Sequence, residues 1–204
     1  MHSNIAACAI FAAVSGSSVA TAATIGSVSL PAFQARGYDE RLVLGSLAAG
    51  GTLGILIPPS INFIVYGVLM EVSIGRLYVA GVLPGILLSL LFMAVILVAA
   101  KIWPQVAPRE AAVPWTIRFL GLLDMLPTFA LIFLVLGTIY LGVATPTEAA
   151  AFGVTGAFVL ALLSGRVKPT ILKEVFFSTA RTTAMVMLIL TGAFILNSTL
   201  AMLG

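Results

Sequence analysis

Two stretches of the sequence combine glycine, proline and hydroxyl residues in a way that suits ion binding. The first is Ser15-Gly16-Ser17-Ser18, and the second runs from Gly50 to Ser60 and contains the pair Pro58-Pro59. Glycine and proline interrupt helices, and an interrupted helix leaves carbonyl oxygens and amide N–H groups without helical partners. Carbonyl and hydroxyl oxygens are neutral ligands for a hard cation such as Na⁺, whereas the amides at a helix start attract an anion. Both stretches are therefore candidate ion sites.

The proline pair determines which carbonyls the second stretch exposes. Pro58 and Pro59 have no N–H, so the carbonyls four residues earlier, of Gly54 and Ile55, lose their helical donors. We expect these oxygens to be available as ligands. The alternative for either stretch taken singly is a structural one, because glycine, serine and proline also serve packing and kinks in transmembrane helices.

The composition indicates the environment of these stretches. The chain has 204 residues, of which 61% are hydrophobic and 8% charged, with a mean hydropathy of +1.19. A soluble domain is about a quarter charged, and a chain of this length keeps roughly 30% of its unfolded surface exposed. So much apolar surface predicts an integral membrane protein. Cys8 is the only cysteine, which excludes a disulfide scaffold, and the scattered net charge of +3 predicts no nucleic-acid partner.

The hydropathy pattern predicts an all-α membrane protein in which a re-entrant hairpin and a broken helix carry the two stretches. A spanning helix needs about 20 apolar residues. The predicted segments are a re-entrant hairpin over 1–33, a broken transmembrane helix over 42–70, a transmembrane helix over 77–101, a cytoplasmic connection with an interfacial helix over 102–126, two transmembrane helices over 127–163 joined at Thr145-Glu148, a cytoplasmic connection over 164–181, and a transmembrane helix over 182–204.

Basic residues predict the orientation of these segments. Nine of the ten Lys and Arg residues fall in the connections at 36–41, 101–118 and 166–181, which the positive-inside rule places in the cytoplasm, and Arg76 is the exception. Each arm of the first segment has 10 to 15 residues, which reach about half way through the bilayer at about 1.5 Å per residue. A hairpin that enters from the cytoplasm and returns fits this length, and a tilted full span is the alternative.

The ends of the chain lead us to expect part of a longer protein. Met1 runs straight into an apolar arm without the basic region or cleavage site of a signal peptide, and no charged tail follows Leu203-Gly204.

Five motifs in order resemble those of a known transporter family. They are Phe11 to Gly26, Arg36-Gly37-Tyr38-Asp39, Ala48 to Ser60, Ala80 to Gly85, and Thr145-Pro146-Thr147-Glu148-Ala149-Ala150-Ala151. Together they are similar to the DctM-like large membrane subunit of the TRAP (tripartite ATP-independent periplasmic) transporters, over roughly residues 5–155. The chain corresponds to the middle of that family's length, and the family's second hairpin has no counterpart here.

The resemblance implies a function and a set of partners. The function would be Na⁺-coupled uptake of an organic acid (a C4-dicarboxylate, a sialic acid or a similar carboxylate) across the bacterial inner membrane. It implies an elevator-type, inverted-repeat transporter, of which this chain would hold the end of the first repeat and the beginning of the second. The implied partners are membrane lipid, a small TRAP membrane subunit, a periplasmic substrate-binding protein and the organic acid. Na⁺ is the coupling ion, and no organic cofactor is expected.

Carried over by position, the resemblance also implies site residues. The Na⁺ candidates are Ser15, Gly16, Ser17, Ser18, Gly54 and Ile57. The substrate candidates are Ser17, Ser18, Thr21, Pro58, Pro59 and Asn62, with packing as the alternative for Asn62. Thr145, Pro146 and Glu148 read as a structural helix start in which Thr145 is the N-cap and Glu148 completes a capping box. Ion binding is the alternative for Glu148, an acidic group near membrane depth.

Two other function classes remain open at this point. One is a non-transporting membrane scaffold or an inactive truncated remnant. The other is an intramembrane hydrolase, which would need a base beside Ser15. His2 is the only histidine, and a helix would hold it roughly 20 Å from Ser15, so we expect no enzyme.

Overall fold

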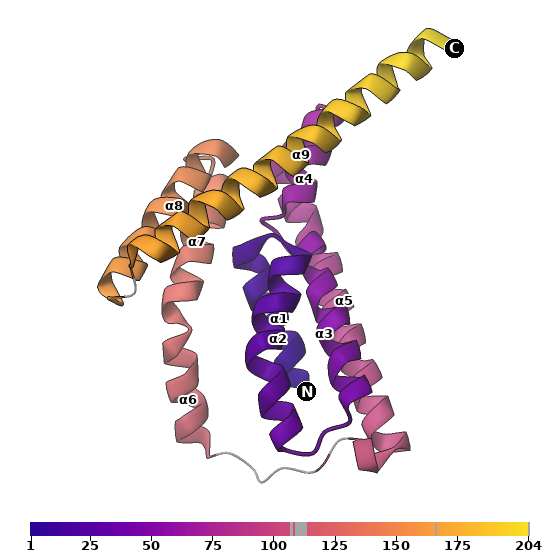
Figure 1. Ribbon diagram of the computed structural model, residues 1–204, viewed down its shortest axis with the longest axis vertical. Helices are drawn as coiled ribbons and strands as arrows, with labels where there is room; N and C mark the ends of the chain where they lie inside the picture. Colours follow the sequence, from indigo (N-terminus) through magenta and orange to yellow (C-terminus); the bar gives the residue numbers. More distant parts are fainter. Residues whose placement is uncertain (107, 109–113, 166, 204) are drawn as a thin grey trace. The chain divides into compact units, whose positions relative to one another are not determined.

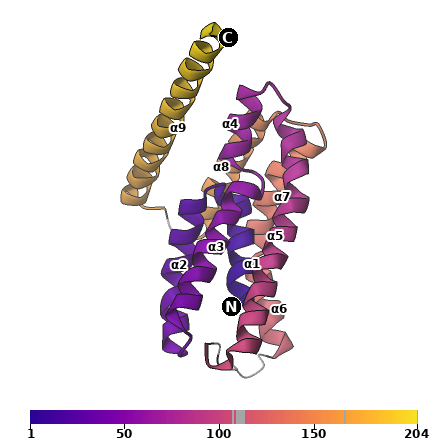
Figure 2. The same cartoon turned by 90° about the vertical axis from the view of Figure 1, so that its right-hand side faces the viewer.

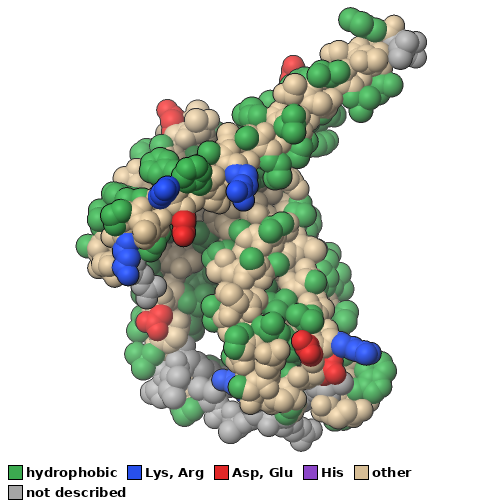
Figure 3. All heavy atoms as spheres, viewed as in Figure 1, with side chains coloured by type: hydrophobic (Ala, Val, Ile, Leu, Met, Phe, Trp, Pro, Cys, Tyr) green, Lys and Arg blue, Asp and Glu red, His purple; other side chains and the backbone are tan. Residues whose placement is uncertain are grey.

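The structure is a computed structural model that describes residues 1–106, 108, 114–165 and 167–203, without the side chains of 106, 116–119 and 203. These residues form helices and no β-strand, and four helical segments are long and apolar enough to cross a membrane. Hydrophobic side chains are spread over the face seen in Figure 3 between backbone and other atoms, with only a few scattered charged side chains. The predicted all-α membrane class is confirmed.

The helices are labelled in Figure 1 in the order in which they follow along the chain. They are α1 (His2–Ser15), α2 (Ser18–Ala35), α3 (Glu40–Leu56), α4 (Ile61–Leu69), α5 (Ile74–Ile102), the 3-10 helix η1 (Pro104–Val106), α6 (Trp115–Asp124), α7 (Leu126–Tyr140), α8 (Pro146–Leu163) and α9 (Pro169–Leu203). The chain divides into two compact units, Met1–Gly153 and Val154–Gly204, and α8 begins in the first and ends in the second.

The core of the first unit lies where the hairpin of α1 and α2 packs against α3 (Figure 2). Apolar side chains of α3 are buried against both arms. One cluster joins Ile5 and Ala12 of α1 to Leu53 of α3 and Ile96 of α5, and the other joins Phe33 of α2 to Val43 and Leu47 of α3. Helix α3 is therefore held by the whole length of the hairpin.

Glycines allow this close approach. A Cβ atom on Gly50 would lie 2.7 Å from Sγ of Cys8 on α1, and one on Gly51 would lie 2.8 Å from Cβ of Ala22 on α2. Without a hydrophobic driving force between helices in lipid, small residues that bring backbones together provide van der Waals contact and hence stability. The two adjacent glycines let α3 fit between the two arms at once.

A polar link joins α1 to α3 near the start of the hairpin. The Nδ2 group of Asn4 donates a hydrogen bond to Oγ of Ser46 over 3.0 Å, and the Ser46 hydroxyl donates to the Val43 carbonyl over 2.8 Å. Asn4 and Ser46 are both buried, and Oδ1 of Asn4 accepts no hydrogen bond from the described residues. This pair fixes the register of α1 on α3.

Side-chain caps explain where several helices begin. Ser17, Asp39, Ser60 and Ser73 each precede a helix in a non-helical conformation, and each side chain accepts a hydrogen bond from an amide two or three residues later. Such caps satisfy amides that have no helical partner. The hairpin is joined to α3 by a tight turn in which Gly37 has φ 71°.

The helix ends differ from the predicted segments at several places. Helix α1 has 14 residues and α2 has 18, or about 21 and 27 Å at about 1.5 Å per residue, so α2 is longer than the expected arm. Helix α9 begins at Pro169 and has 35 residues, so much of the predicted connection 164–181 is helical. Hydropathy locates apolar stretches, whereas a helix continues through polar residues until its backbone is interrupted. The membrane boundaries of all segments stay predictions.

Candidate functional site

The hairpin turns at Gly16 and Ser17. Gly16 ends α1 in the left-handed region, with φ 58° and ψ 14°, and its N–H donates to the Ala12 carbonyl over 2.9 Å. Ser17 is extended, and its hydroxyl accepts a hydrogen bond from the N–H of Ala20 over 3.3 Å. Glycine adopts the left-handed region without steric cost, whereas a residue with a side chain would be strained there. The turn brings the C-terminal end of α1 next to the N-terminal end of α2.

Two hydroxyls of the tip and one backbone carbonyl form a hydrogen-bond network. The Thr21 hydroxyl donates to the Ser17 carbonyl over 2.8 Å, and the Thr21 N–H donates to the same oxygen over 3.0 Å. The Ser15 and Thr21 hydroxyls are hydrogen-bonded over 2.9 Å. Thr21 is fully buried. In this structure Thr21 therefore supports the tip from inside, and its predicted contact with substrate stays a prediction.

The helix break between α3 and α4 has its own polar contacts. The Ile57 N–H donates to the Leu53 carbonyl over 2.8 Å, after which Pro58 and Pro59 offer no donor. The Ser60 hydroxyl donates to the Ile55 carbonyl over 2.7 Å. Ile55 is thus not the free ligand that the proline pair predicts, because a hydroxyl replaces the missing N–H. The Gly54 carbonyl receives no bond from Pro58 and keeps its predicted availability.

The tip and the break lie in direct contact (Figure 2). A Cβ atom on Gly54 would lie 2.7 Å from the carbonyl carbon and oxygen of Ser17 and 2.8 Å from the nitrogen of Ser18. A Cβ atom on Gly16 would lie 2.7 Å from the carbonyl oxygen of Pro59 and 3.5 Å from Cα of Ser60. Four helix ends therefore meet here: the C-terminal ends of α1 and α3 and the N-terminal ends of α2 and α4.

The electrostatics of this meeting point come from the backbone. No residue from 15 to 21 or from 50 to 62 carries a charge. Helix C-termini carry partial negative charge and N-termini partial positive charge, so this arrangement offers oxygens to a cation and amides to an anion. Within the described ranges, no group of three or more His, Cys, Asp and Glu residues is placed to hold a metal ion. The oxygens that this meeting point presents are neutral carbonyl and hydroxyl oxygens.

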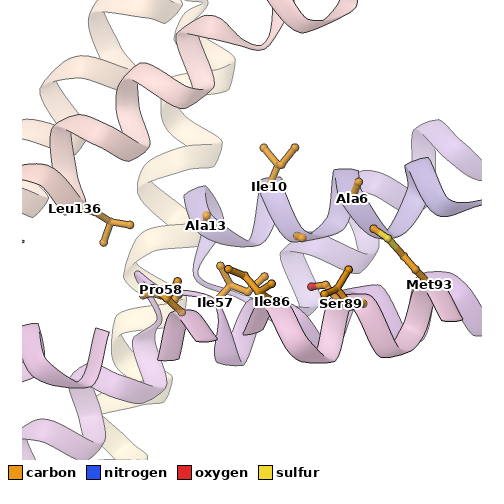
Figure 4. A pocket seen from close by; sticks show the side chains of 12 residues that line it. Ala6, Ile10, Ala13, Ile57, Pro58, Ile86, Ser89, Met93 and Leu136 are labelled. Carbon is orange, nitrogen blue, oxygen red and sulfur yellow. The ribbon is translucent and has the colours of Figure 1, made fainter. Parts of the chain in front are cut away.

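The remaining predicted site residues lie at different places around the break. The Ile57 side chain packs on α5, where a Cβ atom on Gly85 would lie 2.8 Å from its Cγ1 atom. With Pro58, Ile57 also lines an apolar cavity of about 380 Å³ between α1, α5 and α7, where Figure 4 shows Ala13 and Leu136 on other walls. Asn62 is exposed, and its N–H donates to the Ser60 hydroxyl over 3.3 Å.

The motif at Thr145 has the hydrogen bonds of a helix start. The Thr145 N–H and hydroxyl each donate to Oε2 of Glu148 over 2.8 Å, and the Glu148 N–H donates to the Thr145 hydroxyl over 3.4 Å. These reciprocal bonds are those of a capping box, and Pro146 follows as the first residue of α8. In this structure the Glu148 carboxylate accepts hydrogen bonds from Thr145 at the start of the helix that it caps.

Sequence reasoning missed the Ser60 hydroxyl, and it named Thr21 as a substrate candidate without its hydrogen bond to the Ser17 carbonyl. Ser60 follows a proline pair, and the donor that Pro59 lacks is a signal that a nearby hydroxyl could supply it. Thr21 lies four residues after the N-cap Ser17, a spacing from which a threonine hydroxyl reaches the carbonyl of the preceding turn. Neither signal predicts whether the hydroxyl, a water molecule or another group makes the hydrogen bond. The packing of α3 against the hairpin determines that.

The comparisons with known proteins bear directly on this arrangement. The family model described as "Tripartite ATP-independent periplasmic transporter, DctM component" matches residues 2–204. The chain belongs to this family. It is 39% identical to the C4-dicarboxylate TRAP transporter large permease protein DctM of Pseudomonas aeruginosa over 197 residues, which are 94% of this chain and 44% of that protein.

Two further relatives show the range of the family. The chain is 34% identical to the DctM protein of Vibrio cholerae, over 97% of this chain and 48% of that protein. It is also 34% identical to the sialic acid TRAP transporter permease protein SiaT of Haemophilus influenzae, over 73% of this chain and 24% of that protein. The chain thus spans less than half the length of the relatives it matches.

Family membership decides several of the predictions. The resemblance to the TRAP large subunit is confirmed. The family consists of transporter permeases, which are not enzymes, so the hydrolase alternative is excluded. With four membrane-capable helices, the chain is a multi-pass protein of the bacterial inner membrane.

Proposed function

We propose that the chain takes part in Na⁺-coupled uptake of an organic acid, as one portion of a TRAP transporter large permease. The observation that carries this proposal is the contact between the hairpin tip and the helix break, where four helix ends meet without a charged side chain. Discontinuous helices with such ends are the pattern by which secondary transporters bind Na⁺ beside an anionic substrate.

The sodium ion would be held by neutral oxygens at the C-terminal ends of α1 and α3. The Gly54 carbonyl, which Pro58 cannot satisfy, and the Ser15 hydroxyl are the candidates that the geometry favours, with Ser17 and Ser18 beside them. The residues present fit a monovalent cation, because carbonyl and hydroxyl oxygens replace a hydration shell without adding negative charge. A bound Na⁺ supplies positive charge at the tip.

The substrate would lie at the N-terminal ends of α2 and α4. The amides after Ser17 and Ser60 begin these helices, and helix N-termini stabilise a carboxylate. Because both N-termini lie next to the candidate sodium oxygens, cation and anion would stabilise each other's binding, which is a coupling free energy between two sites. The relatives named for C4-dicarboxylate and sialic acid support an organic acid as the substrate class.

The transport partners follow from the family's tripartite description. We infer that a small TRAP membrane subunit completes the membrane complex and that a periplasmic substrate-binding protein delivers the organic acid. Membrane lipid covers the apolar outer surface, of which Leu83 and Val95 on α5 are exposed examples.

Uptake into proteoliposomes tests this proposal. The complete permease containing this chain is reconstituted with its small subunit and binding protein, and radiolabelled succinate and sialic acid are offered with external NaCl or KCl. We expect uptake of at least one acid in NaCl only. Gly54→Leu should abolish it, since its side chain meets backbone atoms of Ser17. Gly45→Leu, on the same helix with no atom within 4 Å of its ideal Cβ position, should not.

Three results would count against the proposal. Equal uptake in NaCl and KCl would exclude sodium coupling. Uptake that Gly54→Leu leaves intact would remove the tip and the break from the site, and a complex that takes up neither acid in either salt would favour a scaffold.

A further inference from the structure

The structure assigns to Thr21 a role that goes beyond the proposed sodium site and rests on it. We propose that Thr21 is a positioning residue. Its hydroxyl donates a hydrogen bond to the Ser17 carbonyl and orients the Ser15 hydroxyl so that the Ser15 oxygen is a ligand for the cation. Three hydrogen bonds and complete burial carry this inference.

The direction of the hydroxyl chain follows from counting hydrogens. The Thr21 hydroxyl has one hydrogen and donates it to the Ser17 carbonyl over 2.8 Å. The contact of 2.9 Å between the Thr21 and Ser15 hydroxyls must then have Ser15 as its donor. The chain runs from the Ser15 O–H to the Thr21 O–H and on to the Ser17 carbonyl.

This direction decides which oxygens remain for a cation. The Ser17 carbonyl already accepts two hydrogen bonds from Thr21, one from the hydroxyl and one from the N–H, and a carbonyl oxygen has two lone pairs. The Ser15 oxygen donates its hydrogen to Thr21, and among the described residues it accepts only the Ser17 N–H, at 3.4 Å. Ser15 therefore offers a lone pair, whereas the Ser17 carbonyl does not.

Removing the Thr21 hydroxyl would free the Ser15 hydrogen. Its other acceptor is the Ser17 carbonyl at 3.4 Å, so the Ser15 hydroxyl would turn or fluctuate. Binding of a cation would then have to fix the orientation of the Ser15 hydroxyl, which costs binding free energy. The predicted consequence is a weaker sodium site with an unchanged set of ligands.

The Thr21 bond differs from ordinary threonine bonds within helices. Thr138, Thr191 and Thr199 also donate to the carbonyl four residues earlier, over 2.8 Å each, and all three hydroxyl bonds are on exposed helix faces. The acceptor of Thr21 is instead the extended N-cap of α2, and a second hydroxyl is bound to it. Thr191 therefore provides a matched control with the same local bond.

Sodium-dependent stabilisation of the purified complete permease containing this chain, in lipid nanodiscs, tests the role of Thr21. The melting temperature is followed while NaCl replaces KCl at constant ionic strength, because a ligand that binds only the folded state stabilises it by RT ln(1 + [L]/Kd), from which the apparent Kd is obtained. Loss of one ordering hydrogen bond should raise the apparent Kd for Na⁺ about tenfold in Thr21→Val, since tenfold corresponds to about 1.4 kcal/mol. Thr21→Ser should stay within about twofold of wild type because it keeps the hydroxyl, and Thr191→Val should not change it.

The outcomes separate this inference from the proposed function. A wild-type chain that responds to Na⁺ together with a Thr21→Val variant of equal Kd would refute the positioning role alone. A wild-type chain without any sodium-specific response would refute the sodium site and this inference with it. If Thr21→Val does not fold, the Ser15→Ala variant replaces it in the same assay. An apparent Kd for Na⁺ equal to that of wild type would overturn the inference, and a Kd about tenfold higher supports it.

Discussion

Replacing Gly54 by alanine should separate the hairpin tip from the helix break. The added Cβ atom would lie 2.7 Å from the carbonyl carbon and oxygen of Ser17, whereas ordinary contact begins at 3.4 Å. These are backbone atoms of the tip, so no side-chain rotation can relieve the overlap. The tip or α3 must move by about 0.7 Å, the difference between 3.4 and 2.7 Å, and overpacking of this kind costs about 1–3 kcal/mol.

A second glycine on the same helix isolates this contact. Gly45 has no atom within 4 Å of its ideal Cβ position. Both replacements gain up to about 1 kcal/mol because alanine favours helix, so the difference between Gly54→Ala and Gly45→Ala measures the overlap alone.

The assay is thermal unfolding of both variants in nanodiscs, in KCl and then in NaCl. At about 2–4 °C per kcal/mol for a chain of this size, Gly54→Ala should melt roughly 2–12 °C below Gly45→Ala. The stabilisation of Gly54→Ala by Na⁺ should also be weaker, since the candidate sodium oxygens of the tip and of the break no longer lie together. Equal melting temperatures for the two variants would refute the argument that the tip is seated against Gly54.

The other predictions concern the hydroxyls and caps around this core. Ser60→Ala removes the part-buried hydrogen bond to the Ile55 carbonyl and should lower the free energy of unfolding by about 0.5–1.5 kcal/mol, measured by thermal unfolding; a neutral change would mean that water replaces the hydroxyl. Ser46→Ala removes the acceptor of the buried Asn4 amide, so unfolding should be easier by about 1–2 kcal/mol, and adding Asn4→Leu should restore part of the loss; a double variant no better than the single one would contradict this. Glu148→Ala should speed hydrogen exchange at the first turn of α8 and leave the sodium dependence unchanged, whereas a change in sodium dependence would make Glu148 an ion ligand.

The interruptions of the helices were predictable from residue types alone. Gly16 and Ser17 combine the one residue that enters the left-handed region freely with a strong N-cap, and Pro58-Pro59 removes two donors in succession. These are local effects of covalent structure. For the same reason the capping box at Thr145 could be predicted, because all its groups lie within one helical turn.

The contacts between interruptions could not be derived from local rules. The resemblance to the family suggested that the tip and the break belong to one site, but the seating of Gly54 on Ser17 depends on the packing of α3 between both arms. The same packing selects Ser60 as the donor to Ile55, which reverses the expectation that this carbonyl is free. Burial of Thr21 follows from the tertiary fold, since nothing in its own helix hides it.

Helix lengths show a further limit of the sequence pattern. Lys173 and Arg181 mark a polar segment, and hydropathy therefore ends the predicted apolar helix at 182. Backbone hydrogen bonding does not depend on side-chain polarity, and α9 starts at Pro169, a residue suited to the first turn of a helix. Apolar length and helical length are separate properties of a membrane protein.

The central claim is that the hairpin tip and the helix break together hold a sodium ion. Equilibrium binding of radioactive sodium to the purified wild-type protein, Gly54→Leu and Gly45→Leu in nanodiscs tests it most directly. The account predicts saturable binding to wild type that unlabelled Na⁺ displaces and K⁺ does not, its loss in Gly54→Leu, and its retention in Gly45→Leu. Absence of saturable binding to wild type, or undiminished binding to Gly54→Leu, would contradict the account.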